Sequence, residues 1–219
     1  MAKSIIAIFD VDGVVIKGQS LLLLVKYLFK KREASFFYFI EVLIWFILYK
    51  FGLRKDIVSM RMKALKIIKG RRVSDVDLML QDFYDKDLKN FLNEKVLKIL
   101  NKHVNCGHIV VLASASIKPL IGIIAKNLGI KYYTSSEIES AGGCYTGNTG
   151  TVVYGKEKLN QVRKLLEQLS LDISDIYVYS DDLSDEPLLS FAKYPNVVNP
   201  DRLLRGIALK RNWEIHDFQ

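Results

Sequence analysis

The chain has 219 residues, of which 50% are hydrophobic and 26% are charged, so it can bury a sizeable core and is not globally disordered. Its net charge of +8 is concentrated between Lys17 and Lys102, where there are 19 Lys and Arg but 9 Asp and Glu. This asymmetry favours an anionic substrate or an anionic membrane surface, and a solvated lysine-rich surface explains it equally well. The two cysteines, Cys106 and Cys144, do not suggest a disulfide framework, and we expect buried, reduced thiols.

The first apolar run extends from Ser4 to Phe9 and stops at Asp10. It is short and lacks a secretory cleavage pattern, so it predicts a core strand rather than a signal peptide, and the cytoplasm is the expected location. Two later runs, His108–Ala113 and Ile176–Ser180, have the same character. Strands that are apolar on both faces are typical of a parallel sheet covered by helices on both sides.

Helical patterns alternate with these strands. Shorter strands are expected at Lys131–Thr134 and Asn196–Val198, and helices at Ile117–Leu128, Lys156–Leu169 and Pro187–Ala192. The alternation predicts a doubly wound, Rossmann-like α/β fold with a parallel sheet. Ligands of such sheets bind at the carboxyl ends of the strands, so Asp10, Ser114 and Asp181 should lie along one edge. The glycine-rich residues 141–150 predict turns of a hairpin or loop.

Residues 17–100 differ from the rest because glycine and proline are scarce and helical patterns follow one another. Helices are expected at Ser20–Leu28, Phe36–Tyr49, Asp56–Ile68 and Ser74–Leu100, with Ser74 and Asp77 as an N-terminal capping signal. This region predicts a helical insertion between two strands of one sheet.

The segment Phe36–Tyr49 is apolar on all sides except at Glu41. It is shorter than the ~20 residues that a helix needs to cross a bilayer. A buried helix and a membrane-facing or lipid-accepting helix both remain open. The flanking cations suit contact with anionic headgroups; they are Lys30, Lys31, Arg32, Lys50, Arg54 and Lys55.

Asp10 and Asp12 follow the first strand two residues apart, so their side chains should point to the same side. Two carboxylates at a ligand-binding edge can bind a hard cation, and one can attack phosphorus while the other transfers a proton. Gly13 lets the backbone bend and a ligand approach closely. An Asp-Gly turn is the simpler alternative for this motif.

Further polar groups follow the other strands. Ser114 precedes a predicted helix, where a hydroxyl and free N–H groups form an anion site, unless Ser114 or Ser116 is a plain helix cap. Lys156 and Lys158 open the helix after Gly155 and could neutralise phosphate. Asp181, Asp182 and Asp185 would repel one another unless a cation or lysine lies between them, although a helix N-terminus also favours acidic residues.

Together these motifs resemble the haloacid dehalogenase superfamily of phosphatases, in particular its phosphoserine-phosphatase-like branch. The resemblance rests on Asp10-Val11-Asp12-Gly13, Ser114, Lys158 with Lys156 as the alternative, and Asp181 with Asp185. It covers the α/β part, and the helical insertion matches the position of the family's cap domain. The resemblance therefore implies a catalytic core of residues 1–16 and 101–219 and an α-helical cap of residues 17–100.

The resemblance also implies roles. Asp10 would be the nucleophile that forms an aspartyl-phosphate, and Asp12 would be the general acid and base. Mg²⁺ would be held by Asp10, the Asp12 carbonyl and Asp181. Ser114, the Ala115 N–H and Lys158 would bind the phosphoryl oxygens, and Asp185 would support the metal water or Lys158. The expected activity is Mg²⁺-dependent hydrolysis of a phosphate monoester, from a small metabolite or a lipid-linked phosphate.

Two residues depart from this branch. Gln19 stands where phosphoserine phosphatases have a glutamate that meets the substrate's ammonium group, which argues against phosphoserine. Asp182 stands where Ser or Gly is usual.

Alternative functions are a phosphotransferase with the same chemistry, a membrane-associated lipid phosphate phosphatase, or a non-catalytic module. Nucleic-acid binding is not expected, because the basic residues are not interleaved with a base-stacking pattern of aromatic residues. The expected partners are a phosphorylated substrate and a membrane surface contacted by the basic, apolar insertion.

Overall fold

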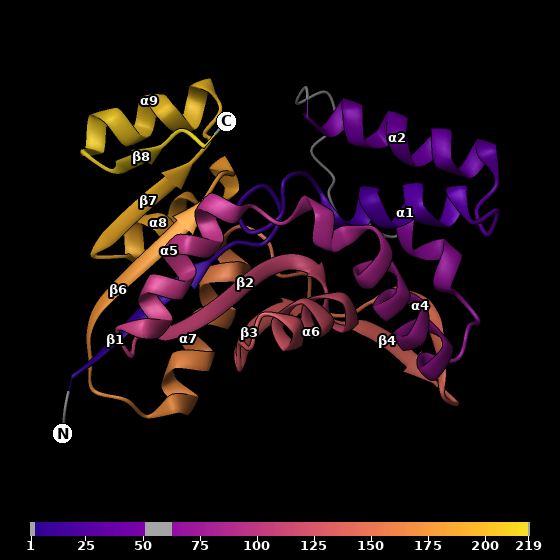
Figure 1. Cartoon of the computed structure of the whole chain (residues 1–219), viewed down its shortest axis with the longest axis horizontal. Helices are drawn as coiled ribbons and strands as arrows, with labels where there is room; N and C mark the ends of the chain where they lie inside the picture. Colours follow the sequence, from indigo (N-terminus) through magenta and orange to yellow (C-terminus); the bar gives the residue numbers. More distant parts are fainter. Residues whose placement is uncertain (1–2, 51–62, 219) are drawn as a thin grey trace.

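The computed structural model describes residues 3–50 and 63–218. Its centre is a six-stranded sheet in the order β3-β2-β1-β6-β7-β8, in which all neighbouring strands are parallel (Figure 1). The strands are β1 (Ser4–Phe9), β2 (Ile109–Ile117), β3 (Tyr132–Ser136), β6 (Ile173–Ser180), β7 (Tyr194–Val198) and β8 (Glu214–His216). The chain runs outward from β1 to β3 and then returns to β6 on the other side of β1. The order of the strands therefore reverses between β1 and β6, and ligands of such sheets bind beside that point.

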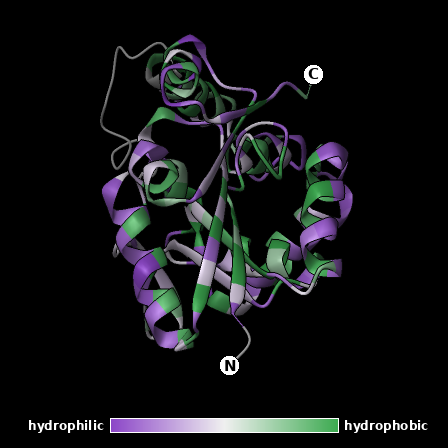
Figure 2. Cartoon of the chain, turned by 90° about the vertical axis from the view of Figure 1, so that its left-hand side faces the viewer, coloured by the Kyte–Doolittle hydropathy of each residue, from purple (hydrophilic) through white to green (hydrophobic). Residues whose placement is uncertain are grey.

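Helices cover both faces of this sheet (Figure 2). One face packs against α5 (Glu94–Asn105) and α6 (Lys118–Asn127), and the other packs against α7 (Lys156–Leu169), α8 (Glu186–Phe191) and α9 (Arg202–Arg211). Alternate residues of β1 supply the two cores: Ala7 and Phe9 face the first, and Ile6 and Ile8 face the second. The predicted doubly wound α/β fold is confirmed, and the strand Ser4–Phe9 and the helix Lys156–Leu169 have their predicted bounds.

The insertion between β1 and β2 contains α1 (Ser20–Lys30), α2 (Phe36–Lys50), a 3₁₀ turn (Lys66–Ile68), α4 (Val73–Lys86) and a second 3₁₀ turn (Leu88–Phe91). In Figure 1, α1 and α2 lie side by side at a distance from the sheet. Most of the helix predicted at Asp56–Ile68 lies outside the described residues.

The single helix predicted at Ser74–Leu100 is wrong, because residues 87–93 interrupt it. There the chain returns to the segment that follows β1: Lys17 N–H donates to Phe91 O at 2.7 Å and Asn93 N–H donates to Val15 O at 2.9 Å. The predicted capping by Ser74 is also wrong, since α4 begins one residue earlier and its N-cap residue, Arg72, has no side-chain capping bond. The next helix, α5, packs on β2, and the boundary predicted at residue 100 falls inside it.

The glycine-rich segment forms the predicted hairpin, with strands β4 (Ile138–Ala141) and β5 (Cys144–Thr149). The hairpin contacts the insertion through its backbone, since Gly70 N–H donates to Tyr145 O at 2.8 Å and Val73 N–H donates to Gly143 O at 2.9 Å. Cys144 is half-buried and Cys106 is exposed, and both are free, so the expectation of buried thiols is wrong.

Helix α2 is not a buried helix. Val42 is its one fully buried hydrophobic residue within the range whose side chains are described, and Phe37 remains 85% exposed. In the described parts of the chain, no helix combines the length and the apolarity that a bilayer crossing needs.

Candidate active site

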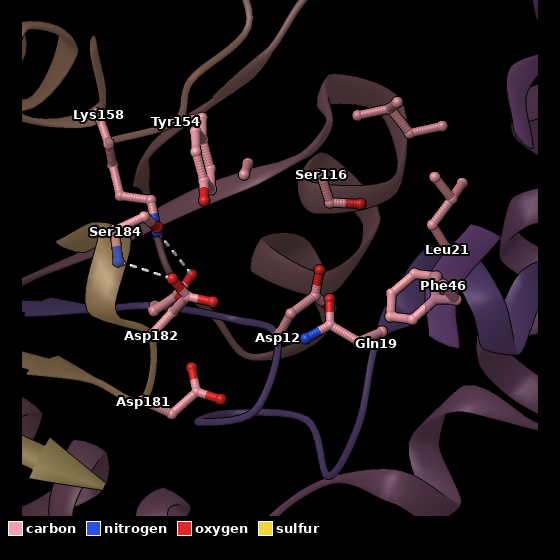
Figure 3. Close-up of a pocket in the computed structure, with 13 residues that line it drawn as sticks. Asp12, Gln19, Leu21, Phe46, Ser116, Tyr154, Lys158, Asp181, Asp182 and Ser184 are labelled. Atoms are coloured by element: carbon pink, nitrogen blue, oxygen red, sulfur yellow. Dashed lines mark hydrogen bonds and ion pairs between the residues drawn. The ribbon is translucent and has the colours of Figure 1, made fainter. Parts of the chain in front are cut away.

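The predicted polar residues meet at the carboxyl ends of β1, β2 and β6 (Figure 3). The register pairs Phe9 with Leu112 on one side and with Tyr179 on the other, and Asp10 N–H donates to Tyr179 O at 2.9 Å. These pairings place Asp10 between the ends of β2 and β6. A cavity opens there, lined by Asp10, Asp12, Gln19, Leu21, Phe46, Ala115, Ser116, Ile117, Tyr154, Lys158, Asp181, Asp182 and Ser184.

Lys158 lies in this cavity between two buried carboxylates. Its Nζ donates to Asp185 Oδ2 at 2.6 Å and lies 3.2 Å from Asp10 Oδ1. Lys158 is 2% exposed, whereas Lys156, in the same turn of α7, is exposed. Of the two lysines that the sequence left open, Lys158 is therefore the one at the site.

The carboxylates outnumber the cations here. Burial raises the pKa of Asp10 to about 8 despite the opposing effect of Lys158, and burial with the charge of Asp10 raises the pKa of Asp181 well above its usual range. Burial alone would lower the pKa of Lys158, but Asp10 and Asp185 together raise it. The site therefore holds a charged lysine and more acidic groups than that one lysine can keep ionised.

Gly13 allows Asp181 to approach the end of β1. A Cβ atom on Gly13 would lie 1.8 Å from Asp181 Oδ2, and its backbone has φ +81°, which other residues adopt reluctantly. Any side chain at residue 13 would therefore displace the Asp181 carboxylate. Glycine is therefore required at residue 13 to leave room for Asp181, which is a constraint that an ordinary Asp-Gly turn does not have.

Asp12 connects the site to the insertion. Its Oδ1 accepts a 2.7 Å hydrogen bond from Ser20 N–H in the first turn of α1, where the helix dipole favours negative charge. Ser20 Oγ is in turn 3.0 Å from Ser116 Oγ at the end of β2. The carboxyl of Asp12 is thus held in one orientation, and the first residue of α1 is tied to both strands.

Ser114 lies in a different local structure from the one predicted. Strand β2 continues to Ile117 and α6 begins at Lys118 with Ile117 as its N-cap residue, so neither Ser114 nor Ser116 caps the helix. Ser114 is fully buried and its Oγ accepts from Ser116 N–H at 3.0 Å. Ala115 and Ser116 line the cavity itself.

Asp182 and Asp185 make internal contacts. Asp182 Oδ1 accepts from Ser184 N–H at 2.7 Å, a dashed line in Figure 3, and thereby caps the short 3₁₀ turn Leu183–Asp185. Asp185 Oδ2 accepts from Ser180 Oγ at 2.7 Å as well as from Lys158. Its other oxygen, Oδ1, is buried and has no hydrogen-bond partner among the described residues.

The opposite wall of the cavity is neutral. Gln19, Leu21 and Phe46 lie on one side in Figure 3, and Lys158 and Asp182 lie on the other. Phe46 comes from α2 and Leu21 from α1, so the insertion covers the site. The cavity volume of about 50 Å³ accommodates a few water molecules.

The donor set fits a hard divalent cation. Carboxylates with a raised pKa, together with the buried, unpartnered oxygen of Asp185, indicate charge that the chain alone does not satisfy. No three acidic, histidine or cysteine side chains within residues 3–50 and 63–218 converge as a complete ligand set. Mg²⁺ is commonly held by one or two carboxylates and keeps several waters, so it does not need such a set.

The sequence predicts eight site residues, and the structure brings seven of them together: Asp10, Asp12, Gly13, Ala115, Lys158, Asp181 and Asp185. The eighth, Ser114, is buried in β2 and does not line the cavity. Several other cavity residues were not assigned to the site, among them Ser116, Tyr154 and Phe46. Ser116 was considered as a helix cap. Tyr154, which precedes Gly155, was not considered, although it stands next to the Gly-x-x-Lys spacing that picked out Lys158. Phe46 reaches the cavity from α2, and nothing in the local sequence indicates which way that helix faces.

Comparison with known proteins agrees with this geometry. A family profile described as haloacid dehalogenase-like hydrolase matches residues 7–190. Phosphoserine phosphatase SerB1 of Mycobacterium tuberculosis is 30% identical over 97% of this chain and 70% of that protein. A structure of a protein of unknown function from Bordetella pertussis superposes with a TM-score of 0.89 at 22% identity, over the full length of both chains. A substrate-bound phosphoserine phosphatase has a TM-score of 0.71 at 16% identity, over 100% of this chain and 95% of that one.

Proposed function

Because the chain belongs to the haloacid dehalogenase-like hydrolases and is a phosphatase of their phosphoserine-phosphatase-like branch, we propose that it hydrolyses a phosphate monoester through a phosphorylated Asp10, with Mg²⁺ as cofactor. The observation that carries this proposal is the buried group of Asp10, Lys158 and Asp185 beside Asp181. A lysine and a cation there would neutralise a phosphoryl group next to an anionic nucleophile.

In this proposal Asp10 attacks phosphorus and the bond to the leaving oxygen breaks. Asp12, oriented by Ser20 N–H, gives its proton to that oxygen and the alcohol departs. Water then attacks the phosphorus of the aspartyl-phosphate, gives a proton to Asp12, and restores the Asp10 carboxylate with release of phosphate. Lys158, already 3.2 Å from Asp10 Oδ1, stabilises the charge on the phosphoryl oxygens.

Asp10, Asp181 and the Asp12 carbonyl would hold the Mg²⁺, which lowers the repulsion between the nucleophile and the phosphate. Ser114 and the Ala115 N–H would bind phosphoryl oxygens. Gly13 would keep Asp181 in place, and Asp185 would hold Lys158, as it does through the 2.6 Å contact.

We also propose that residues 17–100 act as a cap over the core formed by residues 1–16 and 101–219. Leu21 and Phe46 support this role, since both belong to the insertion and line the cavity. The return of the chain to Val15 and Lys17 at residues 91–93 supports an end of the cap near residue 92 rather than at residue 100. The phosphate ester itself is a small metabolite or a lipid-linked phosphate in this proposal.

The experiment is acid quenching during turnover of a ³²P-labelled aryl phosphate with Mg²⁺. We expect label on the wild-type protein that is lost at alkaline pH and is absent from Asp10→Asn. In Asp12→Asn we expect slower turnover, because the proton donor is lost while the nucleophile remains. A chelator should abolish turnover, and added Mg²⁺ should restore it.

Full hydrolysis by Asp10→Asn would refute the nucleophile. Hydrolysis by the wild type with no acid-stable label, even on the millisecond scale, would argue for direct attack by water.

A further inference from the structure

The outer face of α2 is the largest concentration of exposed apolar side chains in the described part of the chain. Phe37 is 85% exposed, Phe36 58%, Ile44 49% and Ile47 45%. At 100° per residue these four side chains lie within about 100° of one another around the helix. They form one continuous stripe, which we call the outer face of α2.

The inner face of the same helix packs against α1 and the active-site cavity. Phe39 stacks on Phe29 of α1 with 5.0 Å between ring centres, Val42 is buried, and Phe46 lines the active-site cavity. These residues lie on the side of the helix opposite Phe37. Packing therefore explains the inner face. On the outer face Phe36 lies against Phe29 with 6.1 Å between ring centres, whereas Phe37, Ile44 and Ile47 remain largely exposed in the part of the chain that the structure describes.

The charges around the outer face are mainly positive. Lys30 and Lys31 precede the turn into α2 and contact Asp87 and Asp82, so both are partly neutralised. Arg32, exposed in that turn, has no acidic partner among the residues described. Glu41 is the single acidic residue of α2, and Lys63 pairs with it.

We propose that the outer face of α2 docks onto an anionic membrane surface. The aromatic and aliphatic side chains would enter the interface between headgroups and acyl chains, while Arg32 and the neighbouring lysines would contact the headgroups. The charge pattern selects this occupant over a second copy of the chain, because two copies would bring cations of the same region together.

The experiment measures binding of the full chain to vesicles of phosphatidylcholine, with and without phosphatidylglycerol, by co-sedimentation. We expect the wild type to bind the anionic vesicles more tightly, and added salt to weaken that binding. The double variant Phe37→Glu with Ile44→Glu should bind at least about tenfold more weakly. Arg32→Glu should lose about fivefold or more, since one basic residue near an anionic surface contributes roughly that factor.

The matched control is the double variant Leu203→Glu with Leu209→Glu on α9, where the side chains are 66% and 65% exposed. It should bind vesicles as the wild type does. Both double variants should hydrolyse a soluble aryl phosphate at the wild-type rate, which shows that the fold is intact. The vesicle result does not depend on turnover, so it stands even if the proposed hydrolysis fails.

Three results would overturn the proposal: no binding of the wild type to anionic vesicles, equal binding by the α2 and α9 variants, or equal binding to neutral vesicles at all salt concentrations. A dimer in solution that Phe37→Glu with Ile44→Glu dissociates, without vesicle binding, would assign the face to a second copy instead.

Discussion

Two polar clusters lie one residue apart along the central strands, and they differ in whether their hydrogen bonds and charges are satisfied. The acidic cluster comprises Asp10, Lys158, Asp181 and Asp185. The histidine cluster comprises His103, His108 and Tyr179. Phe9 stacks on Tyr179 with 4.4 Å between ring centres. The residue after Phe9, Asp10, belongs to the acidic cluster, and the residue after Tyr179, Ser180, donates a hydrogen bond to Asp185 of that cluster.

The histidine cluster is hydrogen-bonded internally. His103 Nδ1 lies 2.8 Å from His108 Nδ1, and His103 Nε2 lies 3.0 Å from Tyr179 Oη. Burial lowers the pKa of His103 to about 4, so its ring is uncharged near neutral pH. The acidic cluster instead holds more acidic groups than its lysine can keep ionised, and Asp185 Oδ1 has no hydrogen-bond partner among the described residues. A buried polar group that lacks a hydrogen-bond partner or a counter-charge within the chain indicates a place for a ligand. A buried polar group that has both stabilises the fold.

The largest expected effect comes from removing Lys158, the positively charged residue of the acidic cluster. Lys158→Met leaves Asp10 and Asp185 buried without their partner, and we expect a loss of about 3–5 kcal/mol in the free energy of unfolding at neutral pH. Urea unfolding measures this loss. The loss should shrink as the pH falls through about 8, because burial raises the pKa of Asp10 to about 8 and a protonated Asp10 does not need the lysine.

Lys156→Met is the matched control in the same helical turn, and its exposed side chain predicts a change within about 0.5 kcal/mol. Equal stability of the two variants would mean that Lys158 contributes no more than a surface lysine.

The histidine cluster should respond to acid in the opposite sense. Its His103 has a pKa of about 4 in the folded chain against an ordinary histidine value of 6.5, so between these pH values the unfolded chain binds a proton that the folded chain does not. Lowering the pH therefore favours unfolding, by at most about 1.4 kcal/mol per pH unit in that window, and this contribution is absent above it. The measurement is the free energy of unfolding from pH 4 to 7.

His103→Gln keeps a polar side chain without a proton to titrate, and its profile should be flatter than that of the wild type. His216→Gln, a histidine outside the cluster, should leave the slope due to His103 in place. If His103→Gln keeps the full acid slope, the cluster is not the group that senses pH.

The same contrast explains what could be predicted from the sequence. The central strands were predictable because burial on both faces makes them apolar at every position, and the acidic cluster because its residues follow strand ends. Lys158 and Lys156 lie on different sides of α7, and spacing along the sequence does not show which side faces the site. The interruption at residues 87–93 depends on pairing with Val15 and Lys17, far away in the sequence, which local periodicity does not reveal. The histidine cluster joins α5, β6 and the loop before β2, and therefore has no sequence signature.

Asp182 shares a feature with each of the two clusters. It is a carboxylate beside the acidic cluster, but its hydrogen bond is satisfied, as those of the histidine cluster are. Its Oδ1 accepts from Ser184 N–H at 2.7 Å, as an N-cap residue does. Asp182→Ala should therefore cost about 1 kcal/mol of stability, while Asp182→Asn, which keeps the acceptor, should cost less. The dependence of hydrolysis on Mg²⁺ concentration gives the second measurement. If Asp182 caps the turn and does no more, Asp182→Asn should retain the wild-type dependence. A large rise in the Mg²⁺ concentration needed for half-maximal activity, with stability unchanged, would assign the charge of Asp182 to the cation.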